Sequence, residues 1–265
     1  MALNIDLENR KAFVSGVSSG IGAGVARLLA QAGCDVIGCG RRGADDPGVV
    51  EFERQVRAAG RKGLYVQADL SDPTAPDQLM KRVAAEFGGQ LDVLVSNAGR
   101  NIFKGASACG EADWDECMNL DLASHWRLAK AARPLMENQE RPGTILIISS
   151  NHAWNTIPGC FPYNVAKAGL LGLVQSLAIE WGSGIRCAGI APGFIDTPGN
   201  DVWFDSFPDP QAERQSTIAM HPVGRIGTVE DIGALCAFLA SPFGGFISGT
   251  TLLADGGRSA LMQSK

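Results

Sequence analysis

Residues 12–32 read AFVSGVSSGIGAGVARLLAQA. An apolar run, Ala12 to Val14, leads into the turn SGVSSGIG at residues 15–22, and a helical pattern continues to Ala32. Glycines at a strand-to-helix turn let the backbone approach a pyrophosphate, whose charge the helix N-terminus stabilises. A glycine-rich turn can also serve packing alone, but its place between a strand and a helix favours nucleotide binding.

The alternation of strand and helix continues along the chain. Short apolar runs bounded by glycine predict seven strands, at residues 12–14, 36–37, 64–66, 91–95, 145–148, 185–190 and 252–253. Longer stretches predict helices at residues 21–32, 48–59, 74–87, 111–138, 161–181 and 229–240. The early strands are continuously apolar, as burial on both faces requires. We therefore expect an α/β fold in one domain, residues 1–265, with a doubly wound parallel sheet and helices on both faces.

The segment 197–227 interrupts this alternation. It carries four prolines and three aromatic residues, which are Pro198, Pro208, Pro210, Pro222, Trp203, Phe204 and Phe207. An insertion of this length in a compact domain is typical of a lid or a binding loop. We expect it to cover a substrate.

Composition excludes several classes of protein. The chain has 265 residues, a net charge of −5, 45% hydrophobic residues and 19% charged residues, which is typical of an ordinary folded core. The longest basic runs are Arg41-Arg42 and Arg61-Lys62. Because contacts to nucleic-acid phosphates need a basic face, we expect no nucleic-acid partner. No apolar stretch reaches the ~18 residues of a membrane span, and the first residues, MALNIDLENRK, do not read as a signal peptide. Seven scattered cysteines without a C-x-x-C pair predict reduced thiols in a cytoplasmic protein and no metal site.

Four motifs together resemble the short-chain dehydrogenase/reductase family. They are Gly16-x-x-x-Gly20-x-Gly22, Ser96-Asn97-Ala98-Gly99, Tyr163-x-x-x-Lys167 and Pro192-Gly193, in the family's order and spacing. The resemblance covers about residues 7–257. It implies a Rossmann sheet of seven parallel strands, an NAD or NADP cofactor and usually a homotetramer.

The resemblance also implies which residues contact the cofactor. They lie at the glycine turn, after the third and fourth strands, at the tyrosine and lysine, and after the sixth strand: Ser15, Gly16, Ser18, Ser19, Gly20, Ile21, Gly22, Asp69, Leu70, Asn97, Ala98, Gly99, Tyr163, Lys167, Pro192, Gly193, Ile195 and Thr197. Asp69 resembles the first member of the family's adenine-contacting pair, although it could equally begin a helix or form a turn. Asn97 has the same alternative as a turn residue.

The end of the second strand indicates which nicotinamide cofactor is bound. Dinucleotide-binding folds that use NAD place an acidic residue there, but this chain has Gly40, followed by Arg41 and Arg42. Guanidinium groups bind a 2′-phosphate through charged hydrogen bonds, so we expect NADP, with NAD as the alternative. In that alternative the two arginines are solvated loop charges, and Asp45 or Asp46 folds back onto the ribose.

Tyr163 and Lys167 are four residues apart in a predicted helix and so share one face. Lowering a tyrosine pKa from about 10 to about 7 requires roughly 4 kcal/mol, which a nearby ammonium and a positive nicotinamide can supply. Ser150 precedes Tyr163 by thirteen residues, and its hydroxyl would hydrogen-bond the substrate oxygen. The neighbouring Ser149 should point to the opposite face of its strand.

The family usually has an asparagine in the helix after the Asn-Ala-Gly motif, and here the resemblance places Asp121 at that position. Asn119 lies roughly 200° away around a helix of about 3.6 residues per turn, so both cannot face the site. In the family this residue positions a water that links the lysine to solvent, largely through its main-chain carbonyl, which Asp121 retains. We therefore expect Asp121 to complete the catalytic set.

Side chains near the end of the sheet could line a substrate pocket, namely His152, Trp154, Asn155 and Trp203. Aromatic residues more often serve packing, and a single histidine is more often structural than catalytic. The expected activity is the interconversion of a secondary alcohol and a ketone, with a small or medium substrate such as a sugar or polyol. The alternatives are a 3-oxoacyl carrier-protein reductase and a catalytically silent nucleotide-binding relative.

Overall fold

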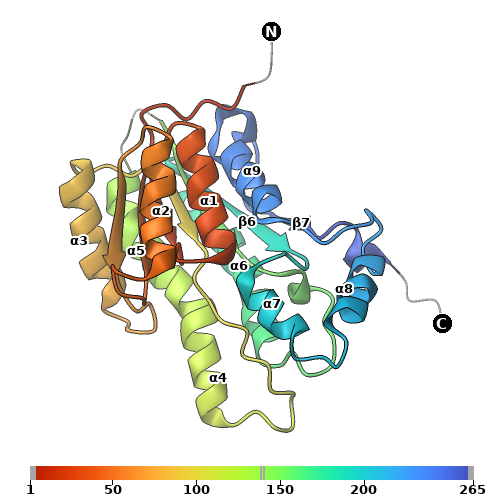
Figure 1. Ribbon diagram of the computed structural model, residues 1–265. Coiled ribbons are helices and arrows are strands. Elements are labelled where there is room, and N and C mark those ends of the chain that lie inside the picture. The colour runs from red at the N-terminus through yellow and green to blue at the C-terminus, as the bar shows by residue number, and fades with distance from the viewer. Residues whose placement is uncertain (1–3, 138, 140, 262–265) are drawn as a thin grey trace.

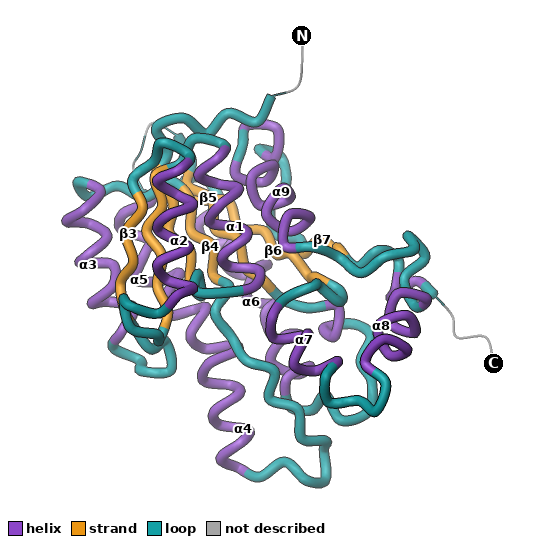
Figure 2. The backbone as a smooth tube through the Cα atoms, in the orientation of Figure 1, coloured by secondary structure: helices purple, strands orange, loops and turns teal. Residues whose placement is uncertain are grey.

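The computed structural model describes residues 4–137, 139 and 141–261. Seven strands form one sheet in the order β3-β2-β1-β4-β5-β6-β7, and every pairing between neighbouring strands is parallel (Figure 2). The strands are β1 (Lys11–Ser15), β2 (Asp35–Gly40), β3 (Gly63–Gln67), β4 (Val93–Ser96), β5 (Gly143–Ile148), β6 (Ile185–Pro192) and β7 (Thr251–Ala254). The predicted seven-stranded parallel sheet is confirmed.

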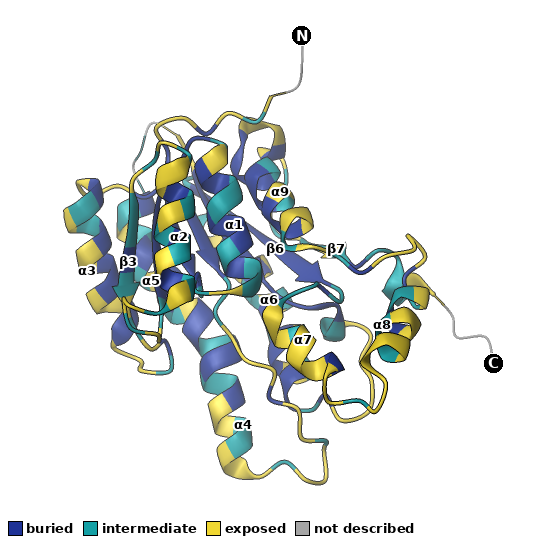
Figure 3. Ribbon diagram, viewed as in Figure 1, coloured by how far each residue is buried: buried dark blue, intermediate teal, exposed yellow. Residues whose placement is uncertain are grey.

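Helices cover both faces of this sheet (Figure 1). One face packs against α1 (Gly20–Gln31), α2 (Pro47–Ala58) and α9 (Val229–Ala240), and the other against α3 (Ala75–Phe87), α5 (Ser124–Met136) and α6 (Tyr163–Trp181). The central strands are buried from both sides (Figure 3). All six residues of β5 are buried. Burial on both faces explains why the strands read as continuous apolar runs.

The strand order reverses between β1 and β4, which lie side by side. The chain leaves β1 toward β2 on one side, whereas β4 leads to β5 on the other. The turns after these two strands therefore open a crevice at the carboxyl edge of the sheet, where doubly wound folds bind their ligands.

The helix expected over residues 111–138 is interrupted, so this prediction was wrong in detail. It consists of α4 (Glu111–Met118), a π-helical turn (Asn119–Ala123) and α5, while Asn138 lies outside the described residues. Within the turn, the Asp121 carboxylate accepts a hydrogen bond from the Arg100 amide at 2.9 Å, and the Ser124 hydroxyl donates to the Leu120 carbonyl at 2.5 Å. Both hydrogen bonds involve a side chain and are additional to the backbone hydrogen bonds of the helix. They accompany the wider π-helical turn, and single π-helical turns of this kind are frequent at functional sites.

Two further expectations need adjustment. The helix expected from residue 161 begins at Tyr163, because Pro162 disfavours the helical conformation at Phe161. The segment 197–227 contains two helices, α7 (Pro198–Phe204) and α8 (Pro210–Ala219). Each of these helices has proline in its first turn, where the missing amide hydrogen costs nothing. The prolines therefore start helices in this segment.

Three expectations, on membrane spans, metal sites and cysteines, can be compared with the structure. None of the helices in residues 4–137 and 141–261 is long and apolar enough to cross a membrane. Within those residues no group of three or more histidine, cysteine or acidic side chains is arranged to hold a metal ion. The seven cysteines all lie in the described part of the chain, and none of them forms a disulfide.

Candidate active site

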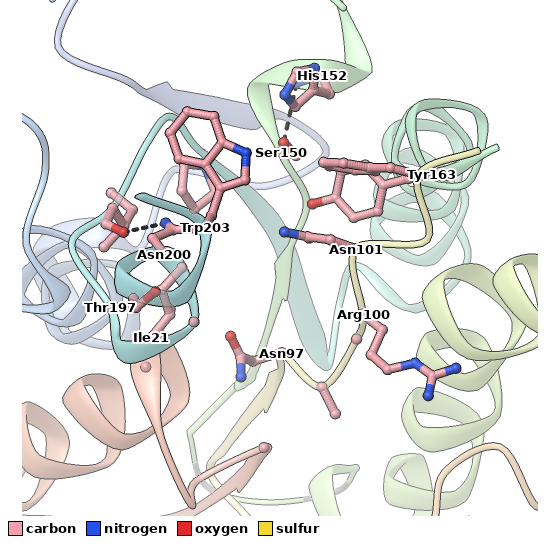
Figure 4. A pocket seen from close by; sticks show the side chains of 18 of the residues that line it. Ile21, Asn97, Arg100, Asn101, Ser150, His152, Tyr163, Thr197, Asn200 and Trp203 are labelled. Atoms are coloured by element: carbon pink, nitrogen blue, oxygen red, sulfur yellow. Dashed lines mark hydrogen bonds between the residues drawn. The ribbon is translucent and has the colours of Figure 1, made fainter. Parts of the chain in front are cut away.

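A cavity of about 1250 Å³ opens at the carboxyl edge of the sheet. Its wall joins the turn after β1, the turn after β4, the end of β5 and the segment that carries α7 (Figure 4). Figure 4 shows Ser150 and Tyr163 at one end of this space, Trp203 opposite them, and Ile21 and Asn97 farther along. The cavity thus connects the glycine turn with the predicted reacting residues.

The glycine turn adopts a backbone that other residues disfavour. Gly16 and Gly20 have φ angles of +78° and +60°. A Cβ on Gly22 would stand 2.2 Å from the Gly16 carbonyl oxygen, so this glycine permits close packing of α1 on the turn. Ser19 precedes the first residue of α1 and lines the cavity, so the N-terminal amides of the helix lie at the cavity wall.

The turn after β4 is locked onto the glycine turn. The Ser15 hydroxyl accepts hydrogen bonds from the backbone amides of Asn97 at 2.9 Å and Ala98 at 3.0 Å. In return, the Asn97 side-chain amide donates to the Ser15 carbonyl at 2.9 Å. Ser15 and Gly22 therefore support the wall from behind and are not part of its surface.

Most of the predicted cofactor residues share the cavity wall. They are Gly16, Ser18, Ser19, Gly20, Ile21, Arg41, Arg42, Asp69, Leu70, Asn97, Ala98, Gly99, Tyr163, Pro192, Gly193, Ile195 and Thr197. Lys167 is 4% exposed and lies behind this surface, where a Cβ on Gly99 would stand 3.5 Å from its ammonium nitrogen. Asp69 also forms a turn, because its carboxylate accepts hydrogen bonds from the amide and hydroxyl of Ser71.

The loop after β2 carries two arginines that differ in their ion pairing. Arg42 forms an ion pair with Asp46 at 3.1 Å, and the Asp46 carboxylate also caps α2 by accepting from the Gly48 amide. For Arg41, no ion pair is formed with any residue that the structure describes. Its backbone carbonyl is held by the Gln67 side chain at 3.0 Å. Asp46 is thus engaged by Arg42 and by the Gly48 amide, whereas Asp45, the other carboxylate of the NAD alternative, forms no ion pair with the described residues.

Ser150 and Tyr163 come together from different elements. Ser150 follows β5 and its hydroxyl accepts from the His152 amide at 3.2 Å, while Tyr163 opens α6. Burial raises the pKa of the Tyr163 phenol above its usual value, a rise that the hydrogen bond with Ser150 opposes. The Ser149 hydroxyl turns away from this pair and donates to the Lys167 carbonyl at 2.9 Å.

Lys167 and Asp121 form a buried pair next to the tyrosine. The Lys167 ammonium lies 3.8 Å from the Asp121 carboxylate and 5.4 Å from the centre of the Tyr163 ring. Burial lowers the pKa of Lys167, and the Asp121 charge acts in the opposite direction. Burial likewise raises the pKa of Asp121, against the effect of Lys167. Each charge therefore favours the ionised form of the other.

Asn119 faces another part of the molecule. Its side-chain amide donates to the Ser71 carbonyl at 2.8 Å, and its amide oxygen accepts from Arg127 at 2.6 Å. Only one of the two candidate positions thus lies beside Lys167, and it is Asp121.

Two of the four expected substrate residues line the cavity, and two do not. His152 and Trp203 are part of its wall. Trp154 is 48% exposed and lies outside the wall, and the Asn155 side chain donates to the Ser259 carbonyl at 2.8 Å. Because the chain forms a short 3-10 helix at Asn151–Ala153, it turns away from the cavity before these two residues.

Residues that the sequence did not single out complete this end of the cavity. They are Phe103, Ile157, Cys160, Phe194, Met220 and Arg258. The Phe103 ring lies edge-on to the Tyr163 ring, with 5.1 Å between centres. An isolated phenylalanine or arginine carries no local signal of its place in a pocket, so periodicity and spacing could not have identified them.

Comparisons with known proteins agree over most of the chain. A family model described as enoyl-(acyl carrier protein) reductase matches residues 16–259. The chain is 34% identical over 253 residues to 3beta-hydroxysteroid dehydrogenase 1 of Eggerthella lenta, covering 95% of this chain and 94% of that protein. It is 33% identical over 255 residues to a 3-oxoacyl-[acyl-carrier-protein] reductase of Vibrio cholerae, covering 96% and 98%.

The fold also matches solved structures. A short-chain dehydrogenase from Burkholderia cenocepacia, crystallised in complex with NADP, superposes with a TM-score of 0.83 at 32% identity. The match covers 95% of this chain and 98% of that chain.

Proposed function

This chain belongs to the short-chain dehydrogenase/reductase family, and on that premise we propose that it is an oxidoreductase that prefers NADP and interconverts a secondary alcohol and a ketone. One observation carries the proposal: Ser150 and Tyr163, backed by Lys167, open on the same cavity as the glycine turn. The NADP complex of the Burkholderia relative supports a nicotinamide cofactor in this position.

The residues at the nucleotide end fit such a cofactor. The N-terminus of α1 at Gly20 lies at the cavity wall and would hold the pyrophosphate. A glycine, Gly40, stands where NAD-binding folds place a carboxylate, and Arg41 has a guanidinium free of ion pairs to the described residues. Arg41 would therefore hold a 2′-phosphate.

When bound, the nicotinamide supplies or accepts the hydride at the carbon that carries the substrate oxygen. The Ser150 hydroxyl would donate a hydrogen bond to that oxygen and stabilise its developing charge. Tyr163 would give its phenolic proton to the same oxygen during ketone reduction. Because burial raises the pKa of Tyr163, the phenol holds this proton at neutral pH and is ready to act as the acid.

In the direction of alcohol oxidation, Tyr163 must act as the base. The Lys167 ammonium near its ring favours the phenolate, whereas the Asp121 carboxylate raises the pKa of Tyr163 and disfavours it. We propose that Asp121 acts through Lys167, keeping the ammonium charged while limiting its effect on the phenol. We propose that the Asp121 main-chain carbonyl holds a water of the proton relay, as the family resemblance implies.

The role of the segment 197–227 and the oligomeric state remain predictions. We propose that the segment 197–227 closes over bound substrate, which is supported by Thr197, Trp203 and Met220 in the cavity wall. We propose the homotetramer that the family resemblance implies, with the exposed apolar side chains of Ile179 and Phe246 as support.

The test of the proposed chemistry is Tyr163→Phe. This substitution removes only the hydroxyl, so turnover of alcohols and ketones with NADP should fall by at least about 10²- to 10⁴-fold, while the Kd for NADP should stay nearly unchanged. Nicotinamide absorbance with a panel of alcohols and ketones measures the rate. Retention of most of the native rate would refute the mechanism, and an inactive native protein would favour the catalytically silent alternative.

A second candidate function is reduction of a 3-oxoacyl group on a carrier protein, which the Vibrio cholerae relative favours. An acidic carrier protein needs a basic surface for docking. Two cations at the cavity wall are already paired, Arg100 with Glu116 and Lys104 with Asp113, and these pairs reduce the positive charge that the wall offers to such a carrier. Comparing the rate on an acetoacetyl carrier protein with that on small ketones separates the two candidates.

A further inference from the structure

Five cationic side chains line the cavity, and most are already neutralised. They are Arg41, Arg42, Arg100, Lys104 and Arg258. Three of them form ion pairs: Arg42 with Asp46, Arg100 with Glu116, and Lys104 with Asp113. Among residues 4–137, 139 and 141–261, neither Arg41 nor Arg258 has such a partner. Arg41 is accounted for at the nucleotide end, which leaves Arg258.

Arg258 lies on a segment that is tied to the reacting end of the cavity. It begins the short 3-10 helix Arg258–Ala260, after β7. The side-chain amides of Asn151 and Asn155 donate to the hydroxyl and the carbonyl of Ser259, at 3.4 and 2.8 Å. Asn151 directly follows Ser150, so these bonds hold Arg258 beside the loop that carries the catalytic serine.

The acidic residue nearest in sequence, Asp255, forms no ion pair with Arg258 in the described part of the chain. Burial lowers the pKa of Arg258, and the Asp255 charge opposes this. The Asp255 carboxylate accepts hydrogen bonds from the backbone amides of Gly257 at 3.0 Å and Ser259 at 2.7 Å, so both of its oxygens are engaged in the turn. The Arg258 guanidinium donates a hydrogen bond to the Met220 sulfur at 3.9 Å, and a thioether sulfur is a weak acceptor. A partly buried guanidinium with so weak a partner favours an anionic ligand.

His152 adds a second unused polar group at the same place. Its Nδ1 atom is buried and has no hydrogen-bond partner in the described part of the chain. Burial lowers the pKa of His152, and the charge of Arg258 lowers it further, so the ring is neutral at neutral pH. The centres of the His152 and Tyr163 rings are 6.2 Å apart. Arg258, His152 and Tyr163 line the same cavity, so a ligand that contacts both Arg258 and His152 would extend toward the Tyr163 ring.

We propose that Arg258, assisted by His152, binds a carboxylate group of the substrate, so that the enzyme acts on hydroxy acids and oxo acids. The planar guanidinium matches a carboxylate with two parallel hydrogen bonds, and a single unpaired cation matches a single negative charge. A phosphate carries nearly two negative charges at neutral pH, which one guanidinium balances only in part, and the other cations at this end, Arg100 and Lys104, are already paired. This inference rests on the proposed function, because it names the substrate class for the same site.

The test measures binding, independently of turnover. Calorimetry with the NADP-loaded enzyme compares butanoate, cyclohexanecarboxylate and benzoate, each with its uncharged amide. At least one acid should bind about 10- to 100-fold more tightly than its amide. Arg258→Met should reduce this ratio to near one. Arg258→Lys should retain part of the ratio, because lysine keeps the positive charge but cannot form the two parallel hydrogen bonds of a guanidinium. Arg54→Met changes the net charge equally at an exposed site on α2 and should leave the ratio unchanged.

Three results would overturn the inference: no acid that binds more tightly than its amide, a ratio that survives Arg258→Met, or cyclohexyl phosphate binding more tightly than cyclohexanecarboxylate. Tyr163→Phe keeps Arg258 and should keep the acid-to-amide ratio. A lost ratio with active turnover of neutral alcohols would therefore count against Arg258 alone. A preserved ratio in an enzyme whose native form turns over no alcohol or ketone would count against the proposed function alone.

Discussion

Replacing Arg41 by alanine should weaken NADP binding by about 10- to 100-fold and leave NAD binding nearly unchanged. The magnitude follows from a hydrogen bond to a charged group, about 1.5 to 3 kcal/mol. The structure supports the full value, because Arg41 forms no ion pair with the described residues that would have to break first. Its loop is also held in place, since the Gln67 amide and the Tyr65 hydroxyl donate to the carbonyls of Arg41 and Arg42.

Arg42 provides the matched comparison. It is paired with Asp46, so Arg42→Ala should weaken NADP binding less than Arg41→Ala. Asp46→Ser keeps a residue that can cap α2 and releases Arg42 from a surface ion pair worth about 0.2 to 1 kcal/mol, so NADP should bind up to about fivefold more tightly. Titration calorimetry with NADP and NAD measures all three variants. The reasoning is refuted if the native protein binds NAD more tightly, or if Arg41→Ala weakens both cofactors equally.

Two further predictions concern the residues behind Tyr163. Asp121→Asn removes a charge that raises the pKa of both Tyr163 and Lys167. While Lys167 keeps its proton, the Tyr163 pKa should fall and the rising limb of alcohol oxidation should move to lower pH; an unmoved rate-against-pH profile would contradict this. Gly99→Ala would place a Cβ 2.4 Å from the Asp121 carboxylate and should lower the free energy of unfolding by about 1 to 3 kcal/mol in urea denaturation. The control Gly172→Ala, in α6 with no atom within 4 Å, should instead raise it by up to about 1 kcal/mol.

The sheet and part of the candidate site were predictable from the sequence because their signals are local. Continuous apolar runs mark strands buried on both faces, and glycines mark the turn after β1. The spacing of Tyr163 and Lys167 along one helix, and of Ser150 before them, is likewise written within a short stretch of chain. Helix periodicity also separated Asp121 from Asn119, although it could not reveal the π-helical turn that contains both.

The substrate end depended on tertiary structure, because its walls come from segments that meet only after folding. Trp154 and Asn155 follow Ser150 directly, yet the chain turns away from the cavity before reaching them. Arg258 instead reaches the cavity, because Ser259 is hydrogen-bonded to Asn151 across 108 residues of chain. Tertiary packing also decides which cations of the cavity wall form ion pairs. A carboxylate lies beside a given cation because of how the chain packs, and sequence spacing does not reveal it. The sequence therefore predicts the fold and the candidate reacting groups, and tertiary packing decides which charged side chains line the cavity.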